Sequence, residues 1–205
     1  MKYTGPKARR ARRLGVNLYG SDKYDKIMAK KPYGPGKGPK TRSGRDSEYA
    51  KQLKEKQKAR VIYGLSEKQF ARLYSEAVKS KGRTGDQIKQ LLEQRLDNLI
   101  YRAGFAMTRM QSRQFAGHGL FMVDGHRVTT PSYRVQPGQV ISIRKQAKDS
   151  PVFVSIRERN QKYLAPKWLK VDTDALKVEV ISAPDAADAE QAVDMRLVVE
   201  YYSRT

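Results

Sequence analysis

A short segment near the middle of the chain carries side chains suited to binding an anion. Residues 108–115 predict a helix whose first turn has a threonine and a glutamine at the spacing of a reciprocal cap. The free amides and the positive dipole end of such a helix attract anions. Arg109, Arg113 and Gln114 cluster around that end, and His118 follows one turn later. Arginine suits a phosphate or an exposed base, because its planar fork bonds two oxygens and stacks on rings.

The elements on either side of this segment predict a compact unit that can hold it rigidly. Apolar residues keep helical spacing over 88–100 until a glycine ends the helix. After the segment, Asp124-Gly125 is the dipeptide of a tight hairpin between short strands at 120–123 and 127–128. Residues 140–143 alternate into a further strand. The predicted fold class is therefore α+β.

Two helices are predicted nearer the start of the chain. The first spans 47–60, and Lys51, Lys54 and Lys58 fall at spacings that place three ammonium groups along one face. The second covers 66–78, opens on a capping box and carries an apolar stripe. A row of lysines is also what a solvated helix face has, so both interpretations stay open for the first helix.

The charge of the chain is concentrated toward one end. The 205 residues carry a formal net charge of +21. Residues 1–60 have a net charge of +14, residues 61–150 of +8 and residues 151–205 of −1. Contacts with a polyanion are therefore expected in the first two segments, and the third is expected to serve structure or protein neighbours.

Residues 1–45 predict an extended basic arm laid along a groove of the polyanion. Glycine lets a backbone approach a phosphate closely, and proline keeps the chain extended. The alternative is a solvated, disordered tail. The basic residues expected to contact the polyanion in this arm are Lys7, Arg9, Arg10, Arg12, Arg13, Lys30, Lys31 and Lys37.

Composition excludes several other kinds of site. The chain has no cysteine, so disulfides, thiolate metal sites and a cysteine nucleophile are excluded. The two histidines do not lie at helical spacing, and no metal or cofactor is predicted. No window is apolar enough to span a membrane or to act as a secretory signal. A protein of the cytoplasm, or of the stroma or matrix of an organelle, is expected.

The central unit resembles the RNA-binding module named after ribosomal protein S-four. The resemblance rests on RLDN at 95–98, TRMQSRQF at 108–115, GH at 117–118, VDG at 123–125 and PGQVISIR at 137–144. RNA-modifying enzymes and synthetases share this module, so by itself it implies only the class of ligand.

Motifs outside the module resemble the ribosomal protein S-four family itself, over nearly the whole length. They are RRLG at 12–15, SEYAKQLKEKQKARVIYGLSEKQF at 47–70, WLKVD at 168–172 and VVEYYS at 198–203. The resemblance implies a structural protein that binds the 5′ domain of 16S-type ribosomal RNA and nucleates assembly of the small subunit. It also implies contact with ribosomal protein S-five and other small-subunit proteins, a part in translational accuracy, and a place near the path by which messenger RNA enters.

The chain departs from its relatives in the basic arm. Some relatives have four metal-binding cysteines there, and this chain has none. Many relatives have PPG followed by histidine and glycine, whereas this chain has Gly34-Pro35-Gly36-Lys37-Gly38. The metal is therefore not expected, and the detailed contacts of the arm are expected to differ.

An RNA-modifying enzyme such as a pseudouridine synthase is the main alternative class. Arg95-Leu96-Asp97 resembles the catalytic fragment of those enzymes, but helical residues follow it, and Asp97 is better explained as a surface or ion-pairing residue. Too little chain remains outside the arm and the module for a catalytic domain. No enzyme is predicted. A membrane-surface protein is disfavoured, because the lysine helix is only thinly apolar.

Two residues of the module stay open between a structural and an RNA-binding role. Arg95 interrupts an apolar helix stripe, so it either extends over the core or faces RNA. Tyr101 is either a core residue or a base-stacking one. The predicted organisation is an arm at 1–45, a helical part at 46–92 completed by 155–205, and an RNA-binding module at 93–154.

Overall fold

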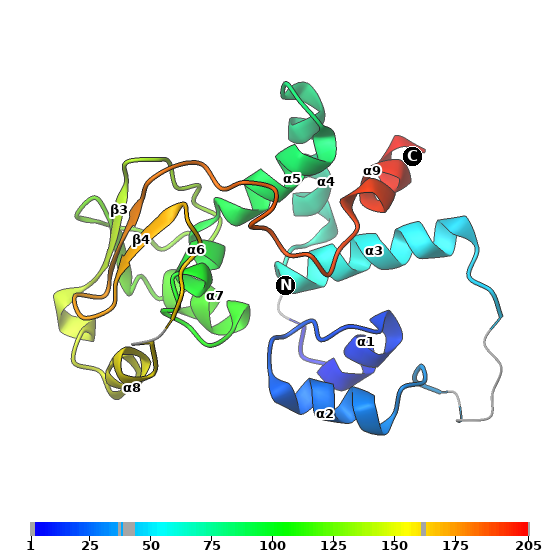
Figure 1. Cartoon of the computed structure of the whole chain (residues 1–205), viewed down its shortest axis with the longest axis horizontal. Coiled ribbons are helices and arrows are strands. Elements are labelled where there is room, and N and C mark those ends of the chain that lie inside the picture. Colours follow the sequence, from blue (N-terminus) through cyan, green and yellow to red (C-terminus); the bar gives the residue numbers. More distant parts are fainter. Residues whose placement is uncertain (1–2, 37, 39–43, 161–162, 205) are drawn as a thin grey trace. The chain divides into compact units, whose positions relative to one another are not determined.

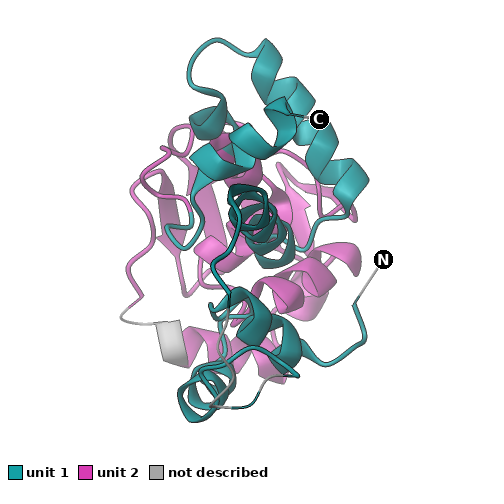
Figure 2. Ribbon diagram, turned by 90° about the vertical axis from the view of Figure 1, so that its right-hand side faces the viewer, with its two compact units in different colours: residues 1–88, 190–205 teal, residues 89–189 magenta. Residues whose placement is uncertain are grey.

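The computed structural model describes residues 3–36, 38, 44–160 and 163–204. It divides into two compact units, the first made of residues 1–88 and 190–205 and the second of residues 89–189 (Figure 2). The first unit is helical, and the second combines helices with an antiparallel sheet (Figure 1). The predicted α+β class is confirmed.

The basic arm begins with two helices, α1 (Lys7–Leu14) and α2 (Asp22–Lys30). The prediction of an extended arm, like the alternative of a disordered tail, is wrong for these residues. Ala11 of α1 is fully buried, and the Arg12 guanidinium donates to the Tyr33 carbonyl with Nη2 2.8 Å away. These contacts inside the first unit offset the repulsion among neighbouring cations that favours an extended chain.

Three further helices of the first unit are α3 (Glu48–Ile62), α4 (Glu67–Lys79) and α9 (Met195–Ser203). The Ser47 hydroxyl caps α3 by accepting from the Ala50 amide, and α4 opens on the predicted capping box. The helix α9 packs against α3 and α4 although it lies more than a hundred residues later in the chain. The end of the chain therefore completes the core of the first unit.

The apolar run at 88–104 forms two helices, α5 (Thr84–Glu93) and α6 (Leu96–Arg102), so the prediction of one continuous helix is wrong. A later loop pairs with the backbone at the break. The Leu96 amide donates to the Tyr133 carbonyl at 2.8 Å, and the Val135 amide donates to the Gln94 carbonyl at 2.9 Å. These tertiary hydrogen bonds replace the helical ones, which sequence periodicity does not reveal.

The predicted helix at 108–115 is α7 (Arg109–Gly117). Thr108 caps it by accepting from the Gln111 amide at 3.2 Å. The Gln111 side chain accepts from the Met107 amide at 2.7 Å, one residue before the position that a reciprocal cap requires. The helix therefore begins where predicted, and only the reciprocal half of the cap differs.

Within the described chain, the strands form a five-stranded antiparallel sheet in the order β2-β1-β3-β5-β4. Their bounds are β1 (Phe121–Val123), β2 (His126–Arg127), β3 (Val140–Ile143), β4 (Leu169–Asp172) and β5 (Lys177–Val180). The predicted hairpin joins β1 to β2, with Asp124 at φ 49° and Gly125 at φ 81°. Two successive positive φ angles give the turn whose twist matches the two strands.

The core of the second unit lies between the sheet and helices α6, α7 and α8 (Pro151–Asn160). Phe121 of β1 stacks on Phe105 and meets Phe153 of α8 edge-on. Because β5 pairs with β3, residues 155–189 belong with the RNA-binding module and not with the helical unit. The predicted division therefore differs from the observed one, and only residues 190–205 return to the first unit.

Candidate nucleic-acid interface

The second unit holds a network of arginines around two buried acids at the junction of α6 and α7. Asp97 is 5% exposed and accepts from both Nε and Nη2 of Arg95, at 3.1 and 2.9 Å. Its Oδ2 also accepts from Nη1 of Arg113 at 2.8 Å. Of the two interpretations of Asp97, ion pairing is confirmed and the surface position is wrong.

Glu93, at the end of α5, is the second acid of this network. Its carboxylate accepts from Nε and Nη2 of Arg102 at 2.9 and 3.0 Å and from the side-chain Nδ2 of Asn98 at 2.6 Å. The Oδ1 of Asn98 then accepts from Nε of Arg109 at 2.9 Å. A chain of hydrogen bonds therefore fixes the orientation of Arg109 on the first turn of α7.

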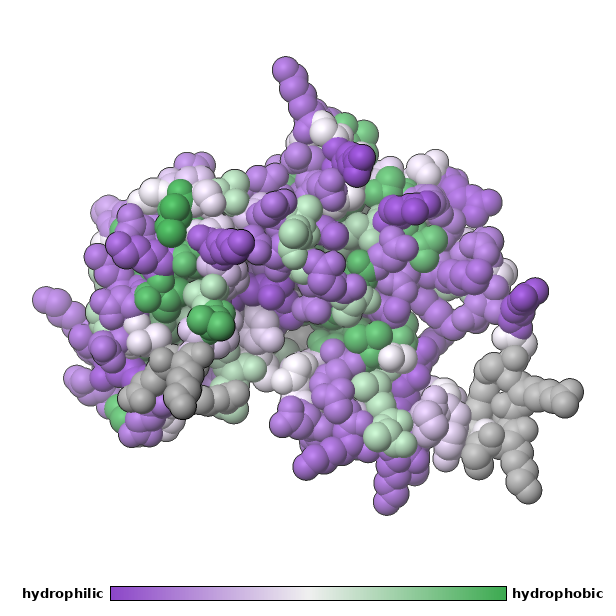
Figure 3. All heavy atoms as spheres, in the orientation of Figure 1, coloured by the Kyte–Doolittle hydropathy of each residue, from purple (hydrophilic) through white to green (hydrophobic). Residues whose placement is uncertain are grey.

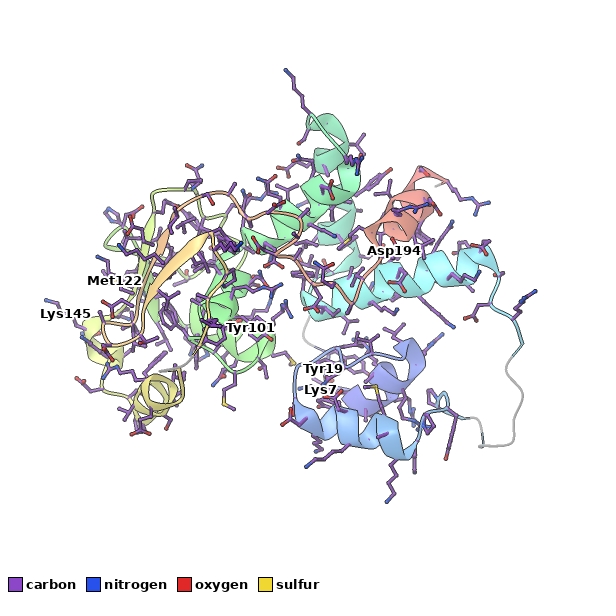
Figure 4. All side chains as sticks on the ribbon, in the orientation of Figure 1. Lys7, Tyr19, Tyr101, Met122, Lys145 and Asp194 are labelled. Atoms are coloured by element: carbon purple, nitrogen blue, oxygen red, sulfur yellow. The ribbon has the colours of Figure 1, made fainter. Side chains whose placement is uncertain are left out.

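Tyr101 lies beneath one of these arginines. The guanidinium carbon of Arg109 is 4.5 Å from the centre of the Tyr101 ring, which is the geometry of a cation–π contact. Tyr101 is half-buried on α6 (Figure 4), so it is neither a fully buried core residue nor a fully open ring.

The network carries more positive than negative charge. Four guanidinium groups surround two carboxylates, which leaves an excess of two positive charges at this junction. Arg95 is 4% exposed and fully engaged by Asp97, whereas Arg113 is partly exposed. An RNA phosphate can therefore approach Arg113 directly, whereas the charge of buried Arg95 is balanced by Asp97.

Gln114 and His118 occupy the exposed side of α7 and its C-terminal end. The chain passes close to Arg127 just after His118, because the Arg127 guanidinium donates to the His118 carbonyl at 3.1 Å. A Cβ on Gly119 would lie 2.4 Å from Nε of Arg127. The φ of 65° favours glycine at this position, and any larger residue would also force the Arg127 side chain to move.

The first unit has a basic hollow of about 380 Å³ between α1 and α2. Its lining combines four cationic residues that the sequence predicts as RNA contacts with two apolar ones: Arg9, Arg12, Lys30, Lys31, Ala8 and Ile27. The hollow therefore brings together residues that lie about twenty positions apart in the chain.

The remaining basic residues of α1 lie in different surroundings. The ammonium of Lys7 lies 5.6 Å from the Tyr19 ring centre (Figure 4), and the Arg10 guanidinium lies 3.3 Å from that of Tyr3. Arg13 is exposed. Lys37 lies outside the described residues. Figure 3 shows hydrophilic side chains over much of the visible face of each unit.

The three lysines of α3 each have an acidic neighbour. Lys51 pairs with Glu48 at 2.6 Å, Lys58 pairs with Glu55 at 2.5 Å, and Lys54 pairs with Asp46. The pairs of Lys51 and Lys54 are exposed, and such pairs are weak and exchange readily with solvent or with another anion. The pair of Lys58 with Glu55 is more shielded from solvent. The lysines are therefore available to a phosphate only in competition with these carboxylates.

The sequence analysis did not single out a further cationic residue of α3, Lys56. It is 5% exposed, and its ammonium donates to Glu67 at 2.8 Å and lies 4.2 Å from the Tyr201 ring centre. The Tyr202 hydroxyl also donates to Glu67, at 2.7 Å. Burial opposes ionisation of Glu67, but the hydrogen bonds from Lys56 and Tyr202 outweigh it and lower its pKa.

Sequence patterns gave little signal for the acids that organise the arginines. Glu93 and Asn98 lie on two helices separated by the break, so no single helical spacing links them. Lys56 is one lysine among several on α3, and only the packing of α9 shows that its face is buried.

The described residues offer no site of two other kinds. No group of three histidine, aspartate or glutamate side chains among them could hold a metal ion. In the same part of the chain, no helix combines the length and the apolar composition that crossing a membrane requires.

Comparison with known families accounts for most of the chain. The family model described as "Ribosomal protein S4/S9 N-terminal domain" matches residues 2–93, and the model described as "S4 domain" matches residues 94–141. The second match covers α6, α7 and the hairpin, and the first stops at Glu93. The boundary between the two matches therefore falls at the helix break.

Similar proteins match the chain over almost its whole length. Small ribosomal subunit protein uS4 of Cutibacterium acnes is 44% identical over 203 residues, and the match covers 99% of each chain. The proteins of that name from Mycobacterium marinum and Latilactobacillus sakei are 43% and 44% identical, with the same coverage. On this similarity and on the two family matches, the chain belongs to the uS4 family of small ribosomal subunit proteins.

Proposed function

We propose that this protein binds small-subunit ribosomal RNA directly, at a multi-helix junction of the 5′ domain, and helps nucleate assembly of the subunit. The observation that carries the proposal is the excess of positive charge held in fixed orientation at the junction of α6 and α7. Structured RNA presents closely spaced phosphates, and oriented guanidinium groups match them in charge and geometry. The family of the chain supports the same ligand.

The proposed contacts come from both units, each considered by itself. Buried Arg95 acts indirectly, because it fixes the Asp97 carboxylate that orients Arg113, and the other residues of the set are proposed to contact RNA themselves. The full set is Lys7, Arg9, Arg10, Arg12, Arg13, Lys30, Lys31, Lys37, Lys51, Lys54, Lys58, Arg95, Arg109, Arg113, Gln114 and His118.

Other roles follow from the family. The protein contacts ribosomal protein S-five and other small-subunit proteins, lies near the path of incoming messenger RNA, and contributes to translational accuracy. Its role is structural, because the one aspartate that resembles a catalytic residue, Asp97, is buried between two arginines. Mixing purified S-five with this protein tests the contact. Failure to co-purify both from their mixture and from reconstituted subunits would contradict it.

The RNA-binding proposal is tested with a transcript of the 5′ domain of small-subunit ribosomal RNA from the same organism. Replacing Arg109 and Arg113 together by alanine should weaken binding by roughly 1–3 kcal/mol for each residue, with an unchanged circular dichroism spectrum. A matched control replaces Lys167 and Lys170, two exposed cations of the same unit, and removes the same charge. Equal affinities of the arginine variant and the wild type would overturn the assignment.

A further inference from the structure

Tyr163 lies beside the arginine network but outside the residues that either family model matches. Its hydroxyl donates to the Arg102 carbonyl at 3.0 Å. Burial raises the pKa of Tyr163, and the nearby Arg102 opposes the shift. The phenol is therefore protonated at neutral pH, and its hydroxyl can donate the hydrogen bond to the Arg102 carbonyl.

The ring of Tyr163 stays accessible although its hydroxyl is held. The residue is 42% exposed, and the next residue, Leu164, is 92% exposed. Removal of apolar surface from water is favourable, and a side chain as exposed as Leu164 contributes almost no such burial to the fold itself. This segment therefore offers an anchored aromatic ring and an adjacent apolar side chain to a ligand.

The surroundings of Tyr163 define the chemistry of that ligand. Arg102 and Arg109 both lie close enough to influence the pKa of Tyr163, and Arg109 covers the Tyr101 ring at 4.5 Å. Flat apolar surface next to excess positive charge fits a ligand that combines a flat ring with an anion. A nucleotide has both, whereas an apolar protein surface would not balance the excess positive charge of the α6–α7 junction.

We propose that Tyr163 stacks on an unpaired nucleobase of the ribosomal RNA, whose flanking phosphates contact the arginines of the α6–α7 junction. The inference rests on the proposed function and adds to it the kind of RNA feature recognised. Bases inside a duplex present no free face, so the nucleotide lies in a loop, a bulge or a junction strand. Leu164 packs at the edge of the same base or its ribose.

The test is ultraviolet crosslinking of the full-length wild-type protein to the 5′ domain transcript, followed by digestion and mass spectrometry. Such crosslinks form where a side chain contacts a base directly. We expect a nucleotide adduct on Tyr163, and we expect that base to be reactive toward single-strand probes in the free RNA. A wild-type complex that crosslinks at other residues but never at Tyr163 would overturn the inference.

Variants separate a stacking role from a structural one. Tyr163→Ala should weaken binding by roughly 5- to 150-fold, the range seen when one stacked base is lost, whereas Tyr163→Phe should retain the adduct and bind within about threefold of wild type. Val154→Ala, which trims another exposed apolar side chain of the same unit, should bind as wild type does. If Tyr163→Phe loses as much affinity as Tyr163→Ala, the hydroxyl acts by fastening the loop and the inference is wrong.

Failure of the inference is distinguishable from failure of the proposed function. If the wild-type protein does not bind the transcript at all, the proposed function is wrong and the inference falls with it. If the wild type binds and Tyr163→Ala binds equally well, RNA binding stands and only the stacking role is removed.

Discussion

The two units use charged side chains in opposite ways. Around Glu67 in the first unit, one carboxylate is shared by Lys56, Arg60 and the Tyr202 hydroxyl in the packing between α3, α4 and α9. At the α6–α7 junction of the second unit, the arginines around Glu93 and Asp97 outnumber the two acids, and Arg109 and Arg113 remain partly exposed. The first arrangement stabilises a core, and the second presents cations in fixed positions.

This difference shows that the density of basic residues does not by itself locate a binding surface. The lysines of α3 are as close together in sequence as the arginines of α7, and each has a neighbouring carboxylate, as Arg113 has in Asp97. What distinguishes the arginines is that two of them, Arg109 and Arg113, are oriented by buried groups while part of each side chain remains accessible.

The largest effect on stability is expected when Asp97 of the second unit is replaced. Asp97→Ala leaves the buried Arg95 guanidinium without its carboxylate, and such a change costs about 3–5 kcal/mol of unfolding free energy. Chemical denaturation measures it, and Asp97→Asn, which keeps an oxygen acceptor, should lose less. A free energy of unfolding for Asp97→Ala within about 1 kcal/mol of the wild type would contradict a central role for this pair.

Replacing Lys51, Lys54 and Lys58 by alanine should have a smaller effect, on RNA binding. Each lysine must leave a carboxylate before it meets a phosphate, so the triple variant should lose on the order of 1 kcal/mol in total. This loss is less than that expected for the arginine pair. Equilibrium binding to the 5′ domain transcript compares them, and a larger loss for the lysine variant would reverse the ranking of the two regions.

The smallest effect concerns the pH dependence of the first unit. The pKa of Glu67 in the folded protein is lowered from its ordinary value of 4.5. At a pH above 4.5, the ionised carboxylate therefore stabilises the fold. That contribution is lost as pH falls through the lower folded pKa. The difference in unfolding free energy between wild type and Glu67→Gln should therefore shrink between pH 5 and about 3. A difference that widens over this range would show that the carboxylate is not held in its charged form.

Sequence alone predicted the local features of the fold. The start of the helix at residue 47, the capping box at Ser66, the hairpin at Asp124-Gly125 and the start of α7 depend on neighbouring residues, and all were recovered. What it missed depends on distant segments. The helix break before Leu96 is made by a loop near Tyr133, and the pairing of β5 with β3 joins residues almost forty positions apart.

The candidate site divides in the same way. Arg109 and Arg113 were found because a capped helix with arginines at its start is a local pattern. The acids that hold them, the buried state of Arg95 and the place of Tyr163 became visible only in three dimensions. The charge of the arm predicts a polyanionic ligand, but it gave no indication of the α1 and α2 helices, which depend on contacts such as that of Arg12 with Tyr33.

The dependence of RNA affinity on salt tests most directly the claim that oriented cations bind the phosphate backbone. The binding constant of the wild-type protein for the 5′ domain transcript should fall by about a thousandfold or more between roughly 50 and 200 mM salt, because each phosphate contact releases counterions. The Arg109→Ala, Arg113→Ala double variant should show a shallower slope on a logarithmic plot. A wild-type affinity that stays constant across this range would contradict the claim.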